Sequence, residues 1–211
     1  MGADSAAGAE PAISAVVLAG GASRRLGQDK CLLPVDGQTL LARTLGLLAA
    51  LSGDLLVVSN DPERAAGLGV PVRLVPDDEP GVGALMGLYS GLKAARHQRA
   101  VAVACDMPFL SLPLLRYMAG LAAAYDVVLP RLGDRVEPLH GVYGKGCLGP
   151  MAHHLALGRR RIIAFFDDVR VRYVEQAEID AYDPHHLSFL NVNTPHDWQQ
   201  VQSLLAGRQV L

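Results

Sequence analysis

Short apolar runs alternate along this chain with segments whose hydrophobic residues recur every three or four positions. The apolar runs fit buried strands, and the sequence predicts such strands over residues 13–18, 54–59, 72–75, 100–104 and 126–130. The spacing of one helix face is shown by Leu41, Leu45, Leu48 and Leu51, and another helix is predicted after Pro113. This alternation, with no internal repeat and no linker, predicts a single three-layer α/β/α domain over residues 13–211, with a mostly parallel, Rossmann-like sheet.

The last third of the chain departs from that alternation. Segments around residues 136–145 and 170–175 are predicted to add antiparallel strands, and an apolar helix is predicted over Ile162–Phe166. Near the end, Thr194 is a good helix N-cap and Asp197 completes a capping box. We therefore expect a final helix.

Composition and charge narrow the class of protein. The 211 residues are 50% hydrophobic and carry a formal net charge of −2, which suits one globular domain with a sizeable core. No basic run occurs, and no apolar stretch reaches the roughly 18 residues that span a bilayer, so nucleic-acid and membrane partners are not expected. Residues 1–12 lack a signal-peptide pattern, which predicts a flexible tail and a cytoplasmic location.

The cysteines and histidines do not point to a disulfide framework or a zinc site. Cys31, Cys105 and Cys147 are odd in number and form no Cys-x-x-Cys pair, so we expect buried thiols without a chemical role. The pairs at 153–154 and 185–186 are adjacent histidines that share no metal-ligand spacing with a third group.

The most informative stretch follows the first predicted strand. Gly20 and Gly21 let the backbone approach a ligand with its N–H groups turned inward, and Arg24, Arg25 and Lys30 add cations beside them. The stretch has neither the Gly-x-x-x-x-Gly-Lys-Ser/Thr loop nor the Gly-x-Gly-x-x-Gly spacing, so a Walker kinase or an NAD enzyme is not favoured. Two interpretations remain: a triphosphate-binding loop, or an ordinary glycine turn with solvated cations.

A second candidate is Asp106, which ends the apolar strand over residues 100–104 and is followed closely by Pro108. The carboxyl end of a strand is where ligands bind in open α/β sheets. Mg²⁺ prefers carboxylate oxygen and is usually held by one or two carboxylates together with substrate phosphates. The alternative is that Asp106 is only a turn residue or a helix N-cap.

The segment from Leu18 to Lys30 reads Leu-Ala-Gly-Gly-x-Ser-Arg-Arg-Leu-Gly-x-Asp-Lys, which resembles the signature of the molybdenum cofactor guanylyltransferases, the MobA family of nucleotidyltransferases. Cys-Asp-Met-Pro at 105–108 resembles the metal-binding motif of that family, and the resemblance extends over about residues 13–205. It implies transfer of GMP from GTP to the terminal phosphate of molybdenum-molybdopterin, with Mg²⁺ as cofactor and pyrophosphate as by-product. Other cofactor-biosynthesis proteins and apo-molybdoenzymes are the protein partners that this activity implies.

The resemblance also implies roles for single residues. Arg25 and Lys30 would hold the β- and γ-phosphates, and Asp106 would bind Mg²⁺. The residues implied in binding the two substrates are Leu18, Ala19, Gly20, Gly21, Lys30, Asn60, Asp77, Asp106 and Arg160, with Arg161 as an alternative to Arg160. Read without the resemblance, Asn60 and Asp77 are turn residues. The glycine-rich stretch over residues 81–87 resembles a loop of the family, called the glycine loop below. Ala84 stands where that loop usually has proline, which bears on the rigidity of the loop.

Asn191 and Asn193 are candidates from geometry. Their alternate spacing places both carboxamides on one face of an extended segment, where they can offer donors and acceptors to the pterin-bearing substrate rather than to GTP. The alternative is that they only tie down the segment before the Thr194 cap. For His140 we expect a structural or substrate-positioning role, because transfer to an existing phosphate needs no proton removed from the nucleophile.

Two other functions stay open. One is a cytidylyl- or sugar-nucleotide-forming relative with the same catalytic core, which selectivity for GTP over CTP would distinguish. The other is a non-catalytic nucleotide-binding subunit that hands a cofactor to an apo-enzyme, in which GTP would bind without release of pyrophosphate.

Overall fold

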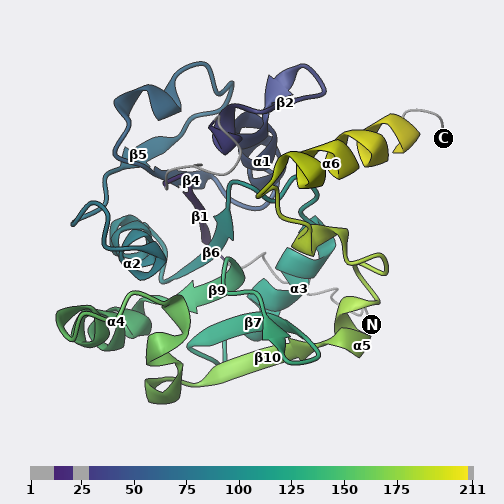
Figure 1. Ribbon diagram of the computed structural model, residues 1–211. Coiled ribbons are helices and arrows are strands. Elements are labelled where there is room, and N and C mark those ends of the chain that lie inside the picture. The colour runs from purple at the N-terminus through teal and green to yellow at the C-terminus, as the bar shows by residue number, and fades with distance from the viewer. Residues whose placement is uncertain (1–11, 21–28, 209–211) are drawn as a thin grey trace, which may run out of the picture.

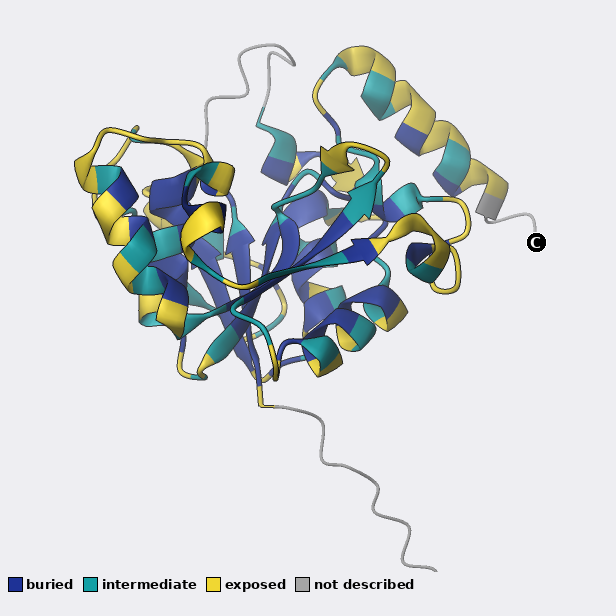
Figure 2. Ribbon diagram, turned by 90° about the horizontal axis from the view of Figure 1, so that it is seen from below, coloured by how far each residue is buried: buried dark blue, intermediate teal, exposed yellow. Residues whose placement is uncertain are grey.

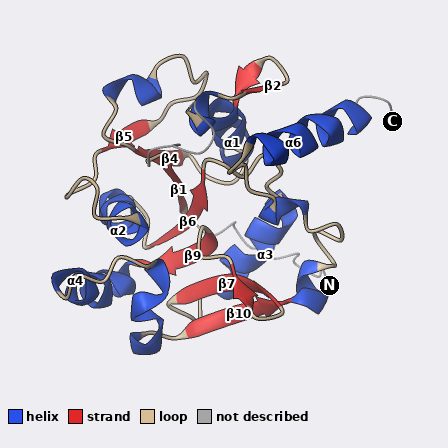
Figure 3. Ribbon diagram, in the orientation of Figure 1, coloured by secondary structure: helices blue, strands red, loops and turns tan. Residues whose placement is uncertain are grey.

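The computed structural model describes residues 12–20 and 29–208, and within them a mixed sheet forms the middle of three layers (Figures 1 and 3). The strand order is β10-β7-β9-β6-β1-β4-β5, and β8 pairs with β7 outside this row. The strands of the sheet are β1 (Ser14–Leu18), β4 (Asp54–Val58), β5 (Arg73–Val75), β6 (Arg99–Ala104), β7 (Val127–Leu132), β8 (Arg135–Val136), β9 (His140–Gly144) and β10 (Val171–Glu175). A separate hairpin consists of β2 (Pro34–Val35) and β3 (Gln38–Thr39).

The helices connect the strands and cover both faces of the sheet. The α-helices are α1 (Leu40–Leu48), α2 (Ala84–Ala94), α3 (Leu112–Leu121), α4 (Leu148–Ala156), α5 (Gln176–Ile179) and α6 (Pro195–Arg208). Short 3₁₀ turns are η1 (Lys30–Leu32), η2 (Pro62–Ala65), η3 (Lys145–Cys147), η4 (Ile162–Asp168) and η5 (Leu187–Phe189). No helix within residues 12–20 and 29–208 combines the length and the apolar character that crossing a membrane requires.

The alternation of side chains along each strand divides the interior into two layers. Val17 points into a core that α1 and α3 cover, whereas its neighbour Val16 points into a core that α2 and α4 cover. Figure 2 shows the sheet buried between helices whose outer faces are exposed. The strands are therefore apolar on both faces, which explains why continuous apolar runs predicted them correctly.

Helix α2 lies unusually close to the sheet. A Cβ atom at Gly91 would lie 2.4 Å from Val16 Cγ1 and 2.9 Å from Val58 Cγ2. Glycine is required here because any side chain would push the helix away from β1 and β4.

One row of residues across the sheet sets the position of the candidate site. Leu18, Val58 and Ala104 are register partners at the carboxyl ends of β1, β4 and β6, and Val75 of β5 is the partner of Val58. Two residues beyond each of these ends come Gly20, Asn60, Asp106 and Asp77. The parallel register therefore brings these predicted residues to one edge of the sheet.

The predicted fold class is confirmed, but the predicted direction of one strand is wrong. β9 and β8 are antiparallel to their neighbours as expected, but β10 pairs with β7 in parallel. Hydrogen bonds from Gly144 N to Asp126 O and from Asp126 N to Arg170 O show that the α4–η4 connection starts and ends at the same edge of the sheet. β9 ends, and β10 begins, at the edge of the sheet where β7 begins. A strand that enters the sheet at this edge runs parallel to β7.

Smaller differences concern the ends of elements. Leu51 lies beyond α1, and the apolar segment from Ile162 forms a 3₁₀ turn rather than an α-helix. The capping box before α6 is present, because Asp197 N donates to Thr194 Oγ1 at 3.2 Å and Thr194 N donates to Asp197 Oδ2 at 2.8 Å. The predicted tail over residues 1–12 lies outside the described residues except for Ala12.

Helix α6 is held by a third, smaller core. Val201 and Leu205 pack in one cluster with Val192, with Phe109, with Val35 of β2 and with Leu40 of α1. Figure 1 shows α6 beside α1 and β2, far in sequence from both. This packing fixes the segment over residues 190–194, which leads into the candidate site.

Candidate active site

A pocket of about 550 Å³ opens at the carboxyl ends of β1, β4 and β6. Six of the predicted residues line it: Leu18, Ala19, Gly20, Lys30, Asp77 and Asp106. The other lining residues are Asp29, Cys31, Val58, Gly81, Gly83, Ala84, Gly87, Ala104, Cys105 and Leu139. This volume lies within the usual range of small-molecule sites, and the pocket follows the rule that ligands bind at the carboxyl edge of an open α/β sheet.

Lys30 and Asp106 form an ion pair in this pocket. Lys30 Nζ lies 3.0 Å from Asp106 Oδ2, and both side chains are about one-fifth exposed, at 18% and 20%. The N-cap interpretation of Asp106 does not hold, because Ser111 caps the next helix by accepting from Leu114 N at 3.3 Å. Asp106 instead presents its carboxylate to the pocket, next to a cation.

Asn193 belongs to the same cluster as Lys30 and Asp106, a contact that the sequence did not predict. Its Oδ1 accepts from Lys30 Nζ at 2.6 Å. The backbone brings it there, because Val192 N donates to Asp106 O at 2.9 Å and so joins the segment before α6 to the end of β6. The prediction from alternate spacing could show that Asn191 and Asn193 share a face, but not which loop that face meets.

Asp77, which lines the pocket, is paired with Asn60, which does not line it. Asp77 N donates to Asn60 Oδ1 at 3.0 Å, and Asn60 Nδ2 donates to Asp77 Oδ2 at 3.4 Å. Asp77 Oδ1 is buried and has no hydrogen-bond partner among the described residues. Burial raises the pKa of Asp77, the hydrogen bond from Asn60 opposes this rise, and the nearby charge of Asp78 adds to it.

Space beside that carboxylate depends on glycine. A Cβ atom at Gly87 would lie 3.2 Å from Asp77 Oδ1 and 3.3 Å from Leu18 Cδ2, closer than ordinary packing allows. Gly20 is less constrained, since its Cβ would lie 3.9 Å from Asp77 Oδ2. Glycine at position 87 therefore keeps a side chain from pressing against the unpartnered oxygen of Asp77.

The glycine loop before α2 meets the arginine segment at 159–161. Gly83 has a φ of 121°, which a residue with a side chain rarely adopts, and its Cβ would lie 3.3 Å from Arg160 Cβ. Leu85 N in the first turn of α2 donates to Arg160 O at 3.3 Å. Arg159 Nη1 instead lies 3.1 Å from His154 Nδ1. Of the arginines at 159–161, Arg160 is therefore the one that contacts the glycine loop.

Several predicted residues are not brought into this arrangement. Arg25 and Gly21 lie outside the described residues. Asn191 does not line the pocket, and its buried Oδ1 finds no partner in the part of the chain that the structure describes. His140 is fully buried against Phe189, with ring centroids 5.3 Å apart, and burial lowers its pKa to about 4. A neutral, enclosed imidazole agrees with a structural role.

Sequence reasoning missed Asp29, although Asp29 directly precedes Lys30. Asp29 caps η1 by accepting from Cys31 N at 3.0 Å and forms an ion pair with Arg64. The signal was an aspartate before a short turn, which is a common cap pattern. Cys31 and Cys105 do line the pocket and are buried as expected of small apolar residues.

The donor set fits a magnesium ion shared with a substrate. Within residues 12–20 and 29–208, no group of three or more His, Cys, Asp or Glu side chains could hold a metal by itself. Asp106 supplies one carboxylate in a pocket large enough for phosphates. Such a site suits Mg²⁺ that takes its other ligands from phosphate oxygens and water.

Comparisons with known proteins show the family of this chain. The family model of the MobA-like NTP transferase domain matches residues 15–175. A probable molybdenum cofactor guanylyltransferase of Pelotomaculum thermopropionicum is 38% identical over 182 residues, which are 86% of this chain and 88% of that relative. A molybdenum cofactor guanylyltransferase of Desulfosudis oleivorans is 34% identical over 200 residues, covering 93% of this chain and 98% of the relative.

A solved structure supports the same assignment. The crystal structure of molybdopterin-guanine dinucleotide biosynthesis protein A from Archaeoglobus fulgidus has a TM-score of 0.80 and 25% sequence identity to this chain. The match covers 92% of this chain and 100% of that one. A family model over most of the chain and relatives above 30% identity over nearly their full length lead to one conclusion: this chain belongs to the MobA-like NTP transferase family.

Proposed function

We propose that this protein is a molybdenum cofactor guanylyltransferase, which transfers GMP from GTP to the terminal phosphate of molybdenum-molybdopterin. The observation that carries the proposal is that one pocket holds both the Lys30–Asp106 pair and the unpartnered oxygen of Asp77. The first is suited to a triphosphate with its metal, and the second to a base that offers donors. The names of the relatives support the choice of substrates.

Asp77 is the residue assigned to recognition of guanine. The Watson–Crick edge of guanine offers a ring N–H and an amino group side by side, and a carboxylate can accept both. Cytosine and adenine each offer only an amino group there. Asp77 Oδ1 lacks a partner in the described chain, and Asn60 holds the other oxygen. A guanine donor therefore removes the cost of a buried, unsatisfied oxygen, which no other base does as well.

Lys30 is assigned to the triphosphate. Lys30 lines the pocket and is the first residue of the turn η1. Arg25, outside the described residues, is assigned to the same phosphates from the sequence. Because both substrates are anions, the main barrier is bringing their charges together, and fixed cations stabilise the transition state and the leaving pyrophosphate.

Asp106 is assigned to the metal. When bound, Mg²⁺ neutralises charge on the phosphates and polarises the phosphorus that is attacked. The carboxylate of Asp106 would hold the ion at the end of β6, and Lys30 forms an ion pair with that carboxylate. The nucleophile is already a phosphate anion, so no side chain has to act as general base.

The second substrate is assigned to the region beside the pocket where Arg160 and Asn191 lie, although neither is among the described residues that line it. Arg160 lies at the glycine loop, and arginine forms forked contacts with phosphate oxygens. The carboxamide of Asn191 is available to a polar heterocycle, whereas Asn193 is engaged with Lys30 and is placed between the two substrates.

The test is release of pyrophosphate with each of the four nucleoside triphosphates, with and without molybdenum-molybdopterin and Mg²⁺. We expect release only with GTP, metal and acceptor together. Preference for CTP would assign the chain to a cytidylyl-transferring relative. Tight binding of GTP without release under any condition would indicate a non-catalytic subunit that hands on the cofactor.

A further inference from the structure

Asp29 and Arg64 form an ion pair beside Lys30, at the wall of the pocket. Asp29 lies in the pocket wall next to Lys30, whereas Arg64 belongs to η2 in the connection between β4 and β5. The Arg64 side chain is 11% exposed and that of Asp29 is 33% exposed, so water competes little for the guanidinium. A shielded, charge-assisted contact of this kind fixes geometry better than an exposed ion pair does.

Asp29 shapes the turn from which Lys30 projects. Its Oδ1 accepts from Cys31 N at 3.0 Å, and its carbonyl accepts from Leu32 N at 3.1 Å, which closes η1. The second carboxylate oxygen, Oδ2, is the one that contacts Arg64. One carboxylate thus joins the backbone of the turn to the guanidinium. The hydrogen bond from Arg64 lowers the pKa of Asp29, which keeps the carboxylate ionised.

Arg64 is itself held in place by the loop that follows β4. Arg64 N donates to Asp61 O at 3.2 Å, and Arg64 Nε lies 3.5 Å from Asp61 Oδ2. Asp61 also caps η2 by accepting from Glu63 N at 3.0 Å, and Pro62 suits the first position of that turn. The guanidinium therefore approaches Asp29 from a defined direction.

We propose that Arg64 is a positioning residue for Lys30, and that it acts by clamping Asp29 and so fixing the η1 turn. This inference rests on the proposed function in one respect, which is that Lys30 binds the triphosphate. Arg64 is absent from the described residues that line the pocket, so it acts through Asp29 rather than on the ligand. A lysine has a flexible stem and no forked geometry, and its effect on a phosphate depends on where its backbone is held.

The test compares affinities for GTP and GMP, both with Mg²⁺, by calorimetric titration. Lys30 is assigned to the β- and γ-phosphates, which GMP lacks. Arg64→Gln is therefore expected to lower the affinity for GTP by about tenfold or more and to change the affinity for GMP by less than about twofold. Asp29→Asn keeps an acceptor for the cap but loses the charge that Arg64 needs, and the same loss in the ratio of the two affinities is expected.

Coupling to Lys30 separates this role from a direct one. In a Lys30→Met background, Arg64→Gln is expected to cause no further change in the ratio of GTP to GMP affinity. An equal further loss in that background would show that Arg64 acts without the lysine and would overturn the proposal. Arg64→Lys retains a cation and one contact, and we expect it to recover part of the ratio.

Arg73→Gln is the matched control for stability. Arg73 also forms an ion pair with one well-buried member, which here is Asp54, but at the opposite edge of the sheet. Its substitution is expected to lower the melting temperature and to leave the GTP to GMP ratio unchanged. If Arg64→Gln does the same, its role is structural and the proposal fails. If another nucleotide is preferred over GTP and the coupling holds with that nucleotide and its monophosphate, only the guanylyl assignment fails.

Discussion

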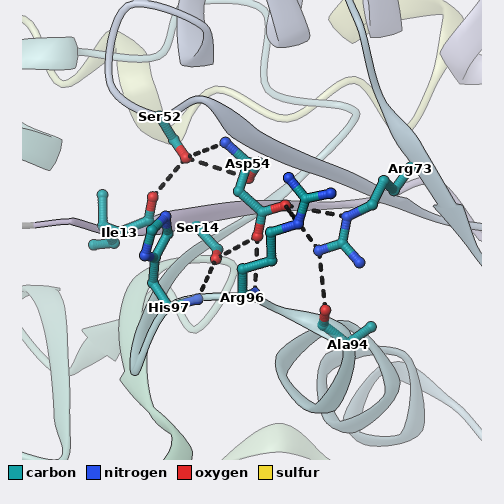
Figure 4. A network of polar contacts seen from close by, with 8 residues as sticks. All are labelled: Ile13, Ser14, Ser52, Asp54, Arg73, Ala94, Arg96 and His97. Carbon is teal, nitrogen blue, oxygen red and sulfur yellow. Dashed lines mark hydrogen bonds and ion pairs between the residues drawn. The ribbon is translucent and has the colours of Figure 1, made fainter.

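Asp54→Asn is predicted to destabilise the fold while leaving nucleotide binding unchanged. Asp54 lies at the start of β4, at the edge of the sheet opposite to the pocket, and its side chain is 3% exposed. Figure 4 shows its carboxylate in contact with Ser14, Arg73 and Arg96. Its carboxylate accepts from Ser14 Oγ at 2.6 Å, from Arg96 N at 2.9 Å and from Arg73 Nη2 at 2.8 Å. One side chain thus joins β1, β4, β5 and the turn that leads into β6.

The magnitude follows from which donors lose their acceptor. Asparagine keeps one oxygen for Arg73 but places an amino group against Ser14 and against the N–H of Arg96. Leaving a buried N–H unpartnered costs about 1–3 kcal/mol, and a smaller loss comes from the Arg73 charge, which is screened because its side chain is 36% exposed. We expect about 3 kcal/mol in total, or a drop of about 6–12 °C in melting temperature for a domain of this size.

The pH dependence gives an independent check. Burial alone would raise the pKa of Asp54, but the hydrogen bonds from Ser14, Arg96 and Arg73 outweigh it and lower the pKa. A carboxyl with a lowered pKa in the folded state contributes stability above its unfolded value of about 3.9, and this contribution is lost as the pH falls toward the folded value. The difference between wild type and Asp54→Asn is therefore expected to shrink below about pH 4.

The assay is thermal unfolding followed by circular dichroism between pH 3 and pH 8, with GTP titration at 25 °C. Asp126→Asn is the control, because Asp126 also pairs with an arginine at this edge but is 31% exposed, and we expect less than half the shift. Equal stability of Asp54→Asn and wild type at neutral pH would refute the reasoning. So would a stability difference that stays constant down to pH 3.

Three further substitutions test the site and the packing above it. Asp106→Asn should abolish Mg²⁺-dependent release of pyrophosphate without lowering the melting temperature, because it removes a metal ligand and no core contact. Gly87→Ala should lower the affinity for GTP, measured by titration, more than the affinity for CTP, since the added methyl group displaces the Asp77 carboxylate. Gly91→Ala should destabilise by about 1–3 kcal/mol in denaturant unfolding, because the clash with Val16 outweighs the better helix propensity.

Local patterns were sufficient for the strands because both faces of the sheet are covered. Val16 and Val17 point to different cores, so the run that contains them is apolar throughout and is recognised by composition alone. The direction of β10 was not recognisable in this way. It depends on where the α4–η4 connection returns to the sheet, which is a property of packing and not of the residues in the strand.

The site was predictable where a residue follows a strand directly, and less so where a loop decides the contact. Asp106 follows β6 and lies where the strand pattern and the family resemblance placed it. Asn193 was predicted to contact the pterin-bearing substrate, and the sequence held no sign of the contact that its oxygen makes with Lys30, far away in sequence. Asp29 precedes η1 and Arg64 lies in η2, and their ion pair joins two loops that are far apart in sequence. The residues around each of them do not predict this contact.

This division has a physical basis in how the pocket is built. Gly20, Asn60, Asp77 and Asp106 each stand two residues beyond a row of register partners, so the hydrogen-bonded sheet fixes their backbone positions. The sheet does not fix their side-chain directions, nor those of Lys30, because these depend on contacts between loops. Substitutions in the strands, or in α2 where it packs on them, should therefore act on stability, whereas substitutions in the loop contacts should act on affinity for the triphosphate and the base. Gly91 and Arg64 represent the two cases, and their measured effects should differ in kind and not only in size.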